Sequence, residues 1–177
     1  EEIGETWVFT SPEVELGPDH PRLKRFDAPV YDNSSIRSRI RTWSAYMLAV
    51  LKFTAGLRAE AVFLNSNPPI LALCGYLAAR RRGMRYIVRV LDVYPDIMVQ
   101  RGMFGAGHVI TRLWRAFNRL TYSRADAVIT LGEVMADRVQ AYAPAGKDVL
   151  VLPTSVDASS IAPRPKTDNW FAAEHGL

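Results

Sequence analysis

The feature that most constrains this chain is a pattern that repeats from Ala61 onward, in which a short apolar run is followed by a turn and a helical stretch. Runs that are apolar at successive positions are typical of strands buried on both faces, and their alternation with helices indicates a parallel sheet. The expected strands are Ala61–Leu64, Arg85–Leu91, Asp126–Leu131 and Asp148–Leu152, and the expected helices are Pro69–Arg82, Gly107–Ser123 and Glu133–Tyr142. The predicted fold class is therefore α/β, a parallel sheet with helices on both faces.

The chain before Ala61 is less regular, and its main feature is a long helical candidate over Ile36–Arg58. Apolar residues recur on it at helical spacing, and basic residues project together from an adjoining side. This composition favours a helix that lies on an anionic membrane, but it also suits a core helix with a basic flank, and both interpretations stay open. The residues expected at the membrane are Arg37, Arg41, Trp43 and Lys52. Two short strands, Trp7–Thr10 and Arg22–Phe26, are expected before this helix, and one short helix, Asp168–His175, is expected at the end of the chain.

Length, charge and cysteine content limit the classes of protein. With 177 residues the chain is long enough for one domain with a sizeable core. The formal net charge of +4 is compatible with an anionic ligand or an acidic membrane surface. Cys74 is the single cysteine, so no internal disulfide can form. We therefore expect a buried, inert thiol and a reducing, cytoplasmic compartment.

Several kinds of site are disfavoured because their motifs are missing. No Gly-x-Gly-x-x-Gly loop follows a strand, and no Gly-x-x-x-x-Gly-Lys-Ser/Thr loop or Gly-x-Ser-x-Gly elbow occurs. His20, His108 and His175 do not show the spacing of metal ligands, so no metal site is proposed. Basic and aromatic residues do not interleave on a strand, so no nucleic-acid partner is expected.

Polar residues follow each of the four expected strands. Because the carboxyl ends of parallel strands meet at one edge of a sheet, these side chains should gather along one rim, where α/β proteins usually bind ligands. Short polar groups of this kind suit hydrogen bonds to the hydroxyl groups of sugars. The rim residues are Asn65, Ser66, Asn67, Asp92, Tyr94, Asp96, Thr130, Gly132, Glu133, Pro153, Thr154, Ser155 and Asp157.

Some of these residues also have structural interpretations. Asn67 can cap a helix that has Pro68 at its first position, and Thr130 with Glu133 has the spacing of a capping box, which is the role we prefer for that pair. Arg89 lies inside an apolar strand, where a guanidinium needs a counter-charge or an anionic ligand. Pairing with Asp92 or Asp126 is the simpler expectation for it.

Three segments resemble the amino-terminal half of family-four glycosyltransferases, and most of all the bacterial subfamily that builds O-antigen, capsule and exopolysaccharide repeat units. They are Arg-Val-Leu-Asp-Val-Tyr-Pro-Asp at 89–96, Leu-Thr-Tyr-Ser-Arg-Ala-Asp-Ala-Val-Ile-Thr-Leu-Gly-Glu at 120–133, and the segment Val151–Asp157. The resemblance covers about Phe63 to the end of the chain and, more loosely, Asp27–Leu57.

The resemblance implies one Rossmann-like half of a two-domain GT-B enzyme. Residues 1–157 would form the acceptor-binding domain, and 158–177 would be a linker and the start of a donor domain. Such enzymes transfer a sugar from a nucleotide-sugar with retention, usually without a metal, to polyprenyl-diphosphate sugars at the cytoplasmic membrane face. The chain itself would need no cofactor and would be inactive alone.

Some positions depart from the family pattern. Its glycine-rich first strand and loop are not recognisable, and its Pro-Asn-Gly-Val-Asp near the hinge is Pro-Thr-Ser-Val-Asp over 153–157. Many relatives carry a histidine next to the position of Asp92, where this chain has Leu91. The family's acidic Glu-x7-Glu pair belongs to the second domain.

Asp92 is the main candidate for orienting or deprotonating the acceptor hydroxyl, and Asp96 is the second. The structural alternative for Asp92 is capping of the strand end. Asn65 and Asn67 could instead shape their loop, and this is the role we prefer for Asn67. The acceptor-binding candidates are Asn65, Ser66, Asn67, Tyr94, Thr130 and Glu133. Two other functions are weighed: a non-catalytic membrane adaptor that recruits a separate donor-binding chain, and a nucleotide-binding regulatory domain.

Overall fold

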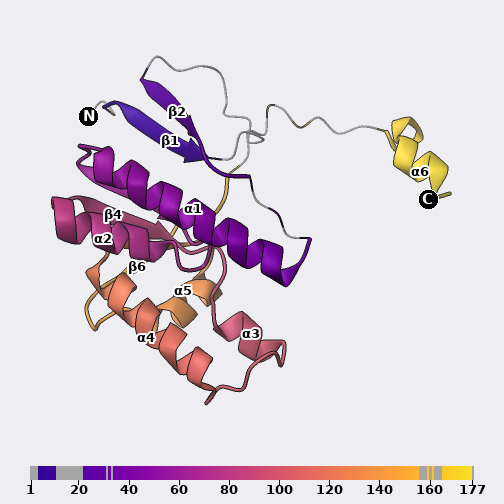
Figure 1. Cartoon of the computed structure of the whole chain (residues 1–177). Helices are drawn as coiled ribbons and strands as arrows, with labels where there is room; N and C mark the ends of the chain where they lie inside the picture. The colour runs from indigo at the N-terminus through magenta and orange to yellow at the C-terminus, as the bar shows by residue number, and fades with distance from the viewer. Residues whose placement is uncertain are drawn as a thin grey trace.

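The computed structural model describes residues 4–10, 22–30, 32, 34–155, 159, 161 and 165–176, and it shows parallel sheets flanked by helices (Figure 1). The larger sheet has four parallel strands in the order β3-β4-β5-β6. These are β3 (Ala61–Asn65), β4 (Arg85–Arg89), β5 (Ala127–Thr130) and β6 (Val149–Val151). The expected α/β class and all four expected strands are confirmed, with ends that differ by one or two residues.

The core of this sheet is formed by the apolar strands and the helices that connect them. Tyr86, Val88 and Val128 are completely buried and pack with residues of three connecting helices. These helices are α2 (Ala72–Arg82), α4 (Val109–Arg124) and α5 (Glu133–Gln140). A short helix that the sequence did not predict, α3 (Asp96–Gln100), follows β4. The strands end in register, with Asn65 beside Arg89 and Thr130 beside Val151, so their carboxyl ends share one edge.

A second sheet and a long helix precede these elements. Strands β1 (Thr6–Thr10) and β2 (Leu23–Asp27) pair in parallel, and α1 (Ile36–Gly56) begins after Ser35, whose hydroxyl accepts a hydrogen bond from the Ser38 N–H. Val50 of α1 packs on Leu64 and Cys74. Burial raises the pKa of the Cys74 thiol to about 11, which agrees with an inert thiol. The described chain ends with a 3-10 turn (Lys166–Asp168) and α6 (Trp170–Glu174), as expected for the last segment.

Two expected helix caps are wrong. Helix α2 begins at Ala72 rather than after Asn67. Pro68 belongs instead to a turn before the helix, in which its carbonyl accepts a hydrogen bond from the Leu71 N–H. Helix α5 begins after Gly132 and has no side-chain cap. The hydroxyl of Thr130, expected to form the capping box, is buried instead and faces the carbonyl of Leu150 at 3.4 Å.

Several apolar residues of α4 are exposed, and several polar ones are buried. Val109 and Leu113 are 64% and 66% exposed, whereas Thr111, Asn118 and Thr121 are buried. The buried polar side chains are satisfied locally: Thr111 donates to the carbonyl of Gly105, Asn118 to that of Tyr94 and Thr121 to that of Phe117. These hydrogen bonds offset the cost of burying the polar groups, so the three polar side chains are buried together with Tyr122 of the same helix.

Candidate functional site

The carboxyl edge of the larger sheet brings together the polar residues that the sequence places after each strand. These side chains differ in how accessible they are to a ligand, because some of them already form hydrogen bonds within the protein. Ser66 is buried, accepts a hydrogen bond from the Leu91 N–H through its hydroxyl, and donates its own N–H to the carbonyl of Arg89. It therefore joins the loops after β3 and β4, and this favours a structural role.

Asp92 lies in the loop that follows β4, with its side chain exposed. Its carbonyl accepts a hydrogen bond from the Tyr94 N–H, but within the described part of the chain its carboxylate has no hydrogen-bond or ion-pair partner. A carboxylate that caps a strand end would hold a backbone N–H, so the geometry does not favour that alternative. The carboxylate of Asp92 is therefore accessible to a ligand.

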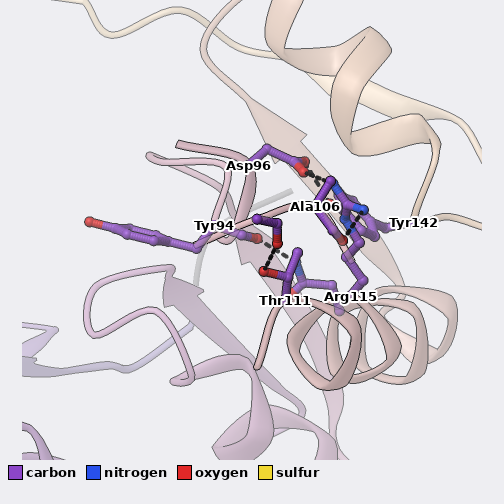
Figure 2. A network of polar contacts seen from close by, with 8 residues as sticks. Tyr94, Asp96, Ala106, Thr111, Arg115 and Tyr142 are labelled. Carbon is purple, nitrogen blue, oxygen red and sulfur yellow. Dashed lines mark hydrogen bonds and ion pairs between the residues drawn. The ribbon is translucent and has the colours of Figure 1, made fainter. Parts of the chain in front are cut away.

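Asp96 is held in a network that Figure 2 shows from close by. One carboxylate oxygen pairs with Nη2 of Arg115 at 2.9 Å, and the other accepts a hydrogen bond from the Tyr142 hydroxyl at 2.6 Å. Burial, followed by the hydrogen bond to Asp96, raises the pKa of Tyr142 to about 12. The hydrogen bond with Asp96 also raises the pKa of Arg115. Because both oxygens are occupied, the geometry favours a structural role for Asp96.

Tyr94 lies between Asp92 and Asp96 in the loop after β4. Its carbonyl accepts a hydrogen bond of 2.6 Å from the Asn118 side chain, and its ring stacks on Trp114 with centroids 5.6 Å apart. In Figure 2 the Tyr94 side chain points away from the Asp96 network. The loop after β4 is therefore anchored to α4 at two points, Tyr94 and Asp96, which hold the intervening backbone in place.

The other acceptor-binding candidates differ in whether their side chains are exposed or buried. Asn65 and Asn67 are exposed and line a cavity of about 960 Å³ that β1, α1 and β3 enclose. Glu133 is exposed in the first turn of α5. Thr130 is completely buried. Asn65, Asn67 and Glu133 can therefore reach a ligand, and Thr130 cannot.

Arg89 does not make the ion pair that the sequence led us to expect. Its Nη2 donates a hydrogen bond of 3.0 Å to the hydroxyl of Thr154, and its buried Nε has no partner among the described atoms. Asp126, one of its expected partners, instead accepts a hydrogen bond from the Tyr86 N–H at 2.8 Å. Asp92, the other, makes no ion pair within the described residues, so the expected pairing of Arg89 is wrong. Of the two explanations that the sequence offered for a cation in an apolar strand, an anionic ligand is the one that the geometry leaves open.

The residues expected at a membrane lie on α1. Arg37, Arg41 and Lys52 are exposed, whereas Trp43 is half-buried with its indole N–H unpaired among the described atoms. Ile36 and Ile40 in the first half of the helix are 75% and 58% exposed. In the part of the chain that the structure describes, no helix combines the length and apolar character needed to cross a bilayer.

Similarity to known proteins agrees with this fold. Residues 7–154 match the glycosyl transferase 4-like domain. The chain belongs to this glycosyltransferase family. It is also similar to a probable glycosyltransferase, WbjE, of Pseudomonas aeruginosa, with 22% identity over 170 residues that cover 95% of the chain and 41% of that relative. The chain thus spans less than half the length of this relative.

Proposed function

We propose that this glycosyltransferase 4-like domain is the acceptor-binding half of a retaining GT-B glycosyltransferase. The observation that supports it best is the carboxyl end of β4, where an exposed carboxylate, Asp92, follows a cation without an acidic partner among the described residues, Arg89. The carboxylate would accept a hydrogen bond from the acceptor hydroxyl and remove its proton as the new bond forms. The donor nucleotide-sugar would be held by a second domain.

The acceptor in this proposal is a lipid-linked sugar that carries a diphosphate, of the kind used in bacterial polysaccharide synthesis. Arg89 would bind its anionic group, since a guanidinium forms strong charge-assisted hydrogen bonds to phosphate. Asn65, Asn67 and Glu133, which are exposed at the same edge, would bind sugar hydroxyls. The family match and the name of the relative support glycosyl transfer in general, and the finer assignment is argued from the chemistry of this edge.

Replacing Arg89 with glutamine tests the anionic acceptor. In the full-length enzyme we expect Arg89→Gln to raise the KM for a polyprenyl-diphosphate acceptor about tenfold or more, because a hydrogen bond to a charged group is worth about 1.5–3 kcal/mol. The KM for the donor should stay unchanged. Arg85→Gln, at the exposed opposite end of the same strand, is the matched control. Equal acceptor KM values for the two variants would contradict the role.

Peripheral membrane contact through α1 belongs to the same proposal. Arg37→Glu with Arg41→Glu should reduce flotation of the protein with anionic vesicles severalfold, since each basic residue near such a surface contributes about 1 kcal/mol. Arg112→Glu with Arg119→Glu, two exposed arginines of α4, changes the net charge equally and serves as the control. If the control pair loses as much binding as the α1 pair, α1 is not the contact.

A further inference from the structure

Helix α4 carries apolar residues on its outer side and polar residues on its buried side. Thr111, Asn118 and Thr121 are buried, and hydrogen bonds within the fold satisfy their side chains. Figure 1 shows α4 running along the outside of the larger sheet. Four small or apolar residues are exposed on the outer side of the helix, and we call them the α4 seam: Val109, Leu113, Ala116 and Leu120.

The α4 seam has the spacing at which one helix packs along another. Its residues follow one another at intervals of 4, 3 and 4 positions, which is the a/d spacing of a heptad repeat. At about 100° per residue they fall within an arc of about 60°, opposite to the buried Asn118. Ala116 has only a methyl group in this row, so a partner helix can approach closely there. A second helix is therefore the element that fits the seam.

The residues beside the seam are mainly basic. Arg112 and Arg119 lie exposed on one side of it, while Ile110, 43% exposed, and Arg124 lie on the other. The side chains of Arg112 and Arg119 form no ion pair with a described residue, and the sequence of α4 contains no Asp or Glu. Charges beside an apolar seam decide which helix pairs with it, so this seam selects a helix with acidic flanks.

A second copy of this chain is a poorer occupant, because it would bring like charges together. In an antiparallel pair of α4 helices, Arg112 of one copy would lie beside Arg119 of the other. In a parallel pair, Arg119 of one copy would lie beside Arg124 of the other. Since like charges at these positions oppose association, the seam favours a partner of different sequence.

A lipid surface also fits the seam less well than a helix does. A helix that lies in a bilayer interface inserts large apolar side chains, and aromatic rings above all. The aromatic residues of α4 are directed to the fold instead: Tyr122 is buried, Trp114 and Phe117 are half-buried, and the Trp114 ring stacks on that of Tyr94. The exposed row is narrow and has a methyl group where an inserted helix would carry a large side chain.

We propose that the α4 seam docks an amphipathic helix of a separate polypeptide, in which Asp or Glu residues flank the apolar row. Asn118, on the opposite side of α4, holds the carbonyl of Tyr94 and with it the loop after β4. A helix on the seam therefore leaves that loop uncovered. Docking at this surface is independent of the acceptor chemistry proposed above.

Two synthetic peptides test whether the full-length protein recognises acidic flanks. Each has about three heptads with leucine at positions a and d, and positions e and g carry glutamate in one peptide and lysine in the other. We expect the glutamate peptide to bind about tenfold more tightly or better, since several exposed ion pairs together contribute that much. Equal affinities in a fluorescence anisotropy titration would overturn the proposal.

Substitutions on α4 test whether the seam is the surface that binds. Arg112→Glu with Arg119→Glu should reverse the preference, so that the lysine peptide binds more tightly. Leu113→Asp should abolish binding of both peptides, because it places a charge in the centre of the apolar contact. Val134→Asp, at a residue of α5 that is 73% exposed, is the matched control and should bind like the wild type. An unchanged preference in the arginine variant, or full binding by Leu113→Asp, would overturn the proposal.

A photo-crosslinking amino acid at position 113 of the full-length protein, expressed in its own cells, identifies the occupant. We expect mass spectrometry to show a link to another polypeptide, at a segment with apolar residues three and four positions apart and acidic residues beside them. The same amino acid at position 134 gives the background yield. A link to a second copy, to another part of the same polypeptide or to lipid would overturn the proposal, and so would a yield at 113 no higher than that at 134.

Discussion

Asp92→Asn in the full-length enzyme is expected to lower the rate of sugar transfer about 100-fold or more, the range that one general base contributes. Asparagine keeps the size of the side chain and can still accept a hydrogen bond, but it cannot take a proton. Asp92 is exposed in the loop after β4, and its carboxylate supports no other described part of the fold, so the folded state should be nearly as stable as before. The measurement is kcat with saturating acceptor and donor.

The control for this substitution is Asp137→Asn, which changes an exposed carboxylate on α5. We expect it to leave kcat unchanged, and we expect both variants to bind the nucleotide-sugar with the affinity of the wild type. A wild-type kcat for Asp92→Asn would exclude Asp92 as the base. Unchanged kcat with a higher acceptor KM would mean that Asp92 binds the acceptor without transferring its proton.

The fold could be predicted because its strands are apolar at nearly every position. Val88 and Val128 lie in runs that suit only a covered parallel strand, and all four such runs form strands of one sheet. The orientation of α4 could not be predicted, because hydropathy treats Thr111 and Asn118 as polar residues. Their donors are satisfied by carbonyl groups of residues 105 and 94, and no periodicity encodes such partners.

The position of the site could be predicted from the sequence, but not which of its side chains are available. Strand ends place Asn65, Asp92 and Thr130 on one edge whatever the details of the loops, since strands in register end together. Which of these side chains is free depends on tertiary contacts. Thr130 is buried, and Asp96 is bound by residues 19 and 46 positions away in the sequence. A motif shows which residue types stand at an edge, and only the three-dimensional contacts show which are still available to a ligand.

Asp96→Ala is expected to destabilise the protein by about 2–4 kcal/mol, because it leaves the Arg115 guanidinium and the Tyr142 hydroxyl without their shared acceptor. The ion pair is only partly accessible to solvent, because the Arg115 side chain is 31% exposed and the Asp96 side chain is 21% exposed. Tyr142→Phe removes one of the two contacts and should cost less. In a double-mutant cycle monitored by urea unfolding, the two changes should be less than additive. Additive losses would mean that the two groups do not interact in solution.

The same network predicts how stability depends on alkaline pH. The pKa of Tyr142 is about 12 in the folded chain and about 10 when unfolded. Since the folded value is the higher one, its contribution is fully present below pH 10 and is lost as the pH rises from 10 to 12. The stability advantage of the wild type over Tyr142→Phe should therefore be constant up to pH 10 and shrink above it. A constant advantage up to pH 12 would contradict this.

A further variant, Asp96→Asn, distinguishes a structural role of Asp96 from a catalytic one. A residue that only fixes the loop after β4 affects how much enzyme is folded, so Asp96→Asn should lower the melting temperature while kcat per folded molecule stays within a few-fold of the wild type. A residue that takes the proton would lose kcat at least 100-fold even at a temperature where the variant is fully folded. Because both oxygens of Asp96 are already bound by Arg115 and Tyr142, we expect the first result, which leaves Asp92 as the carboxylate available to the acceptor.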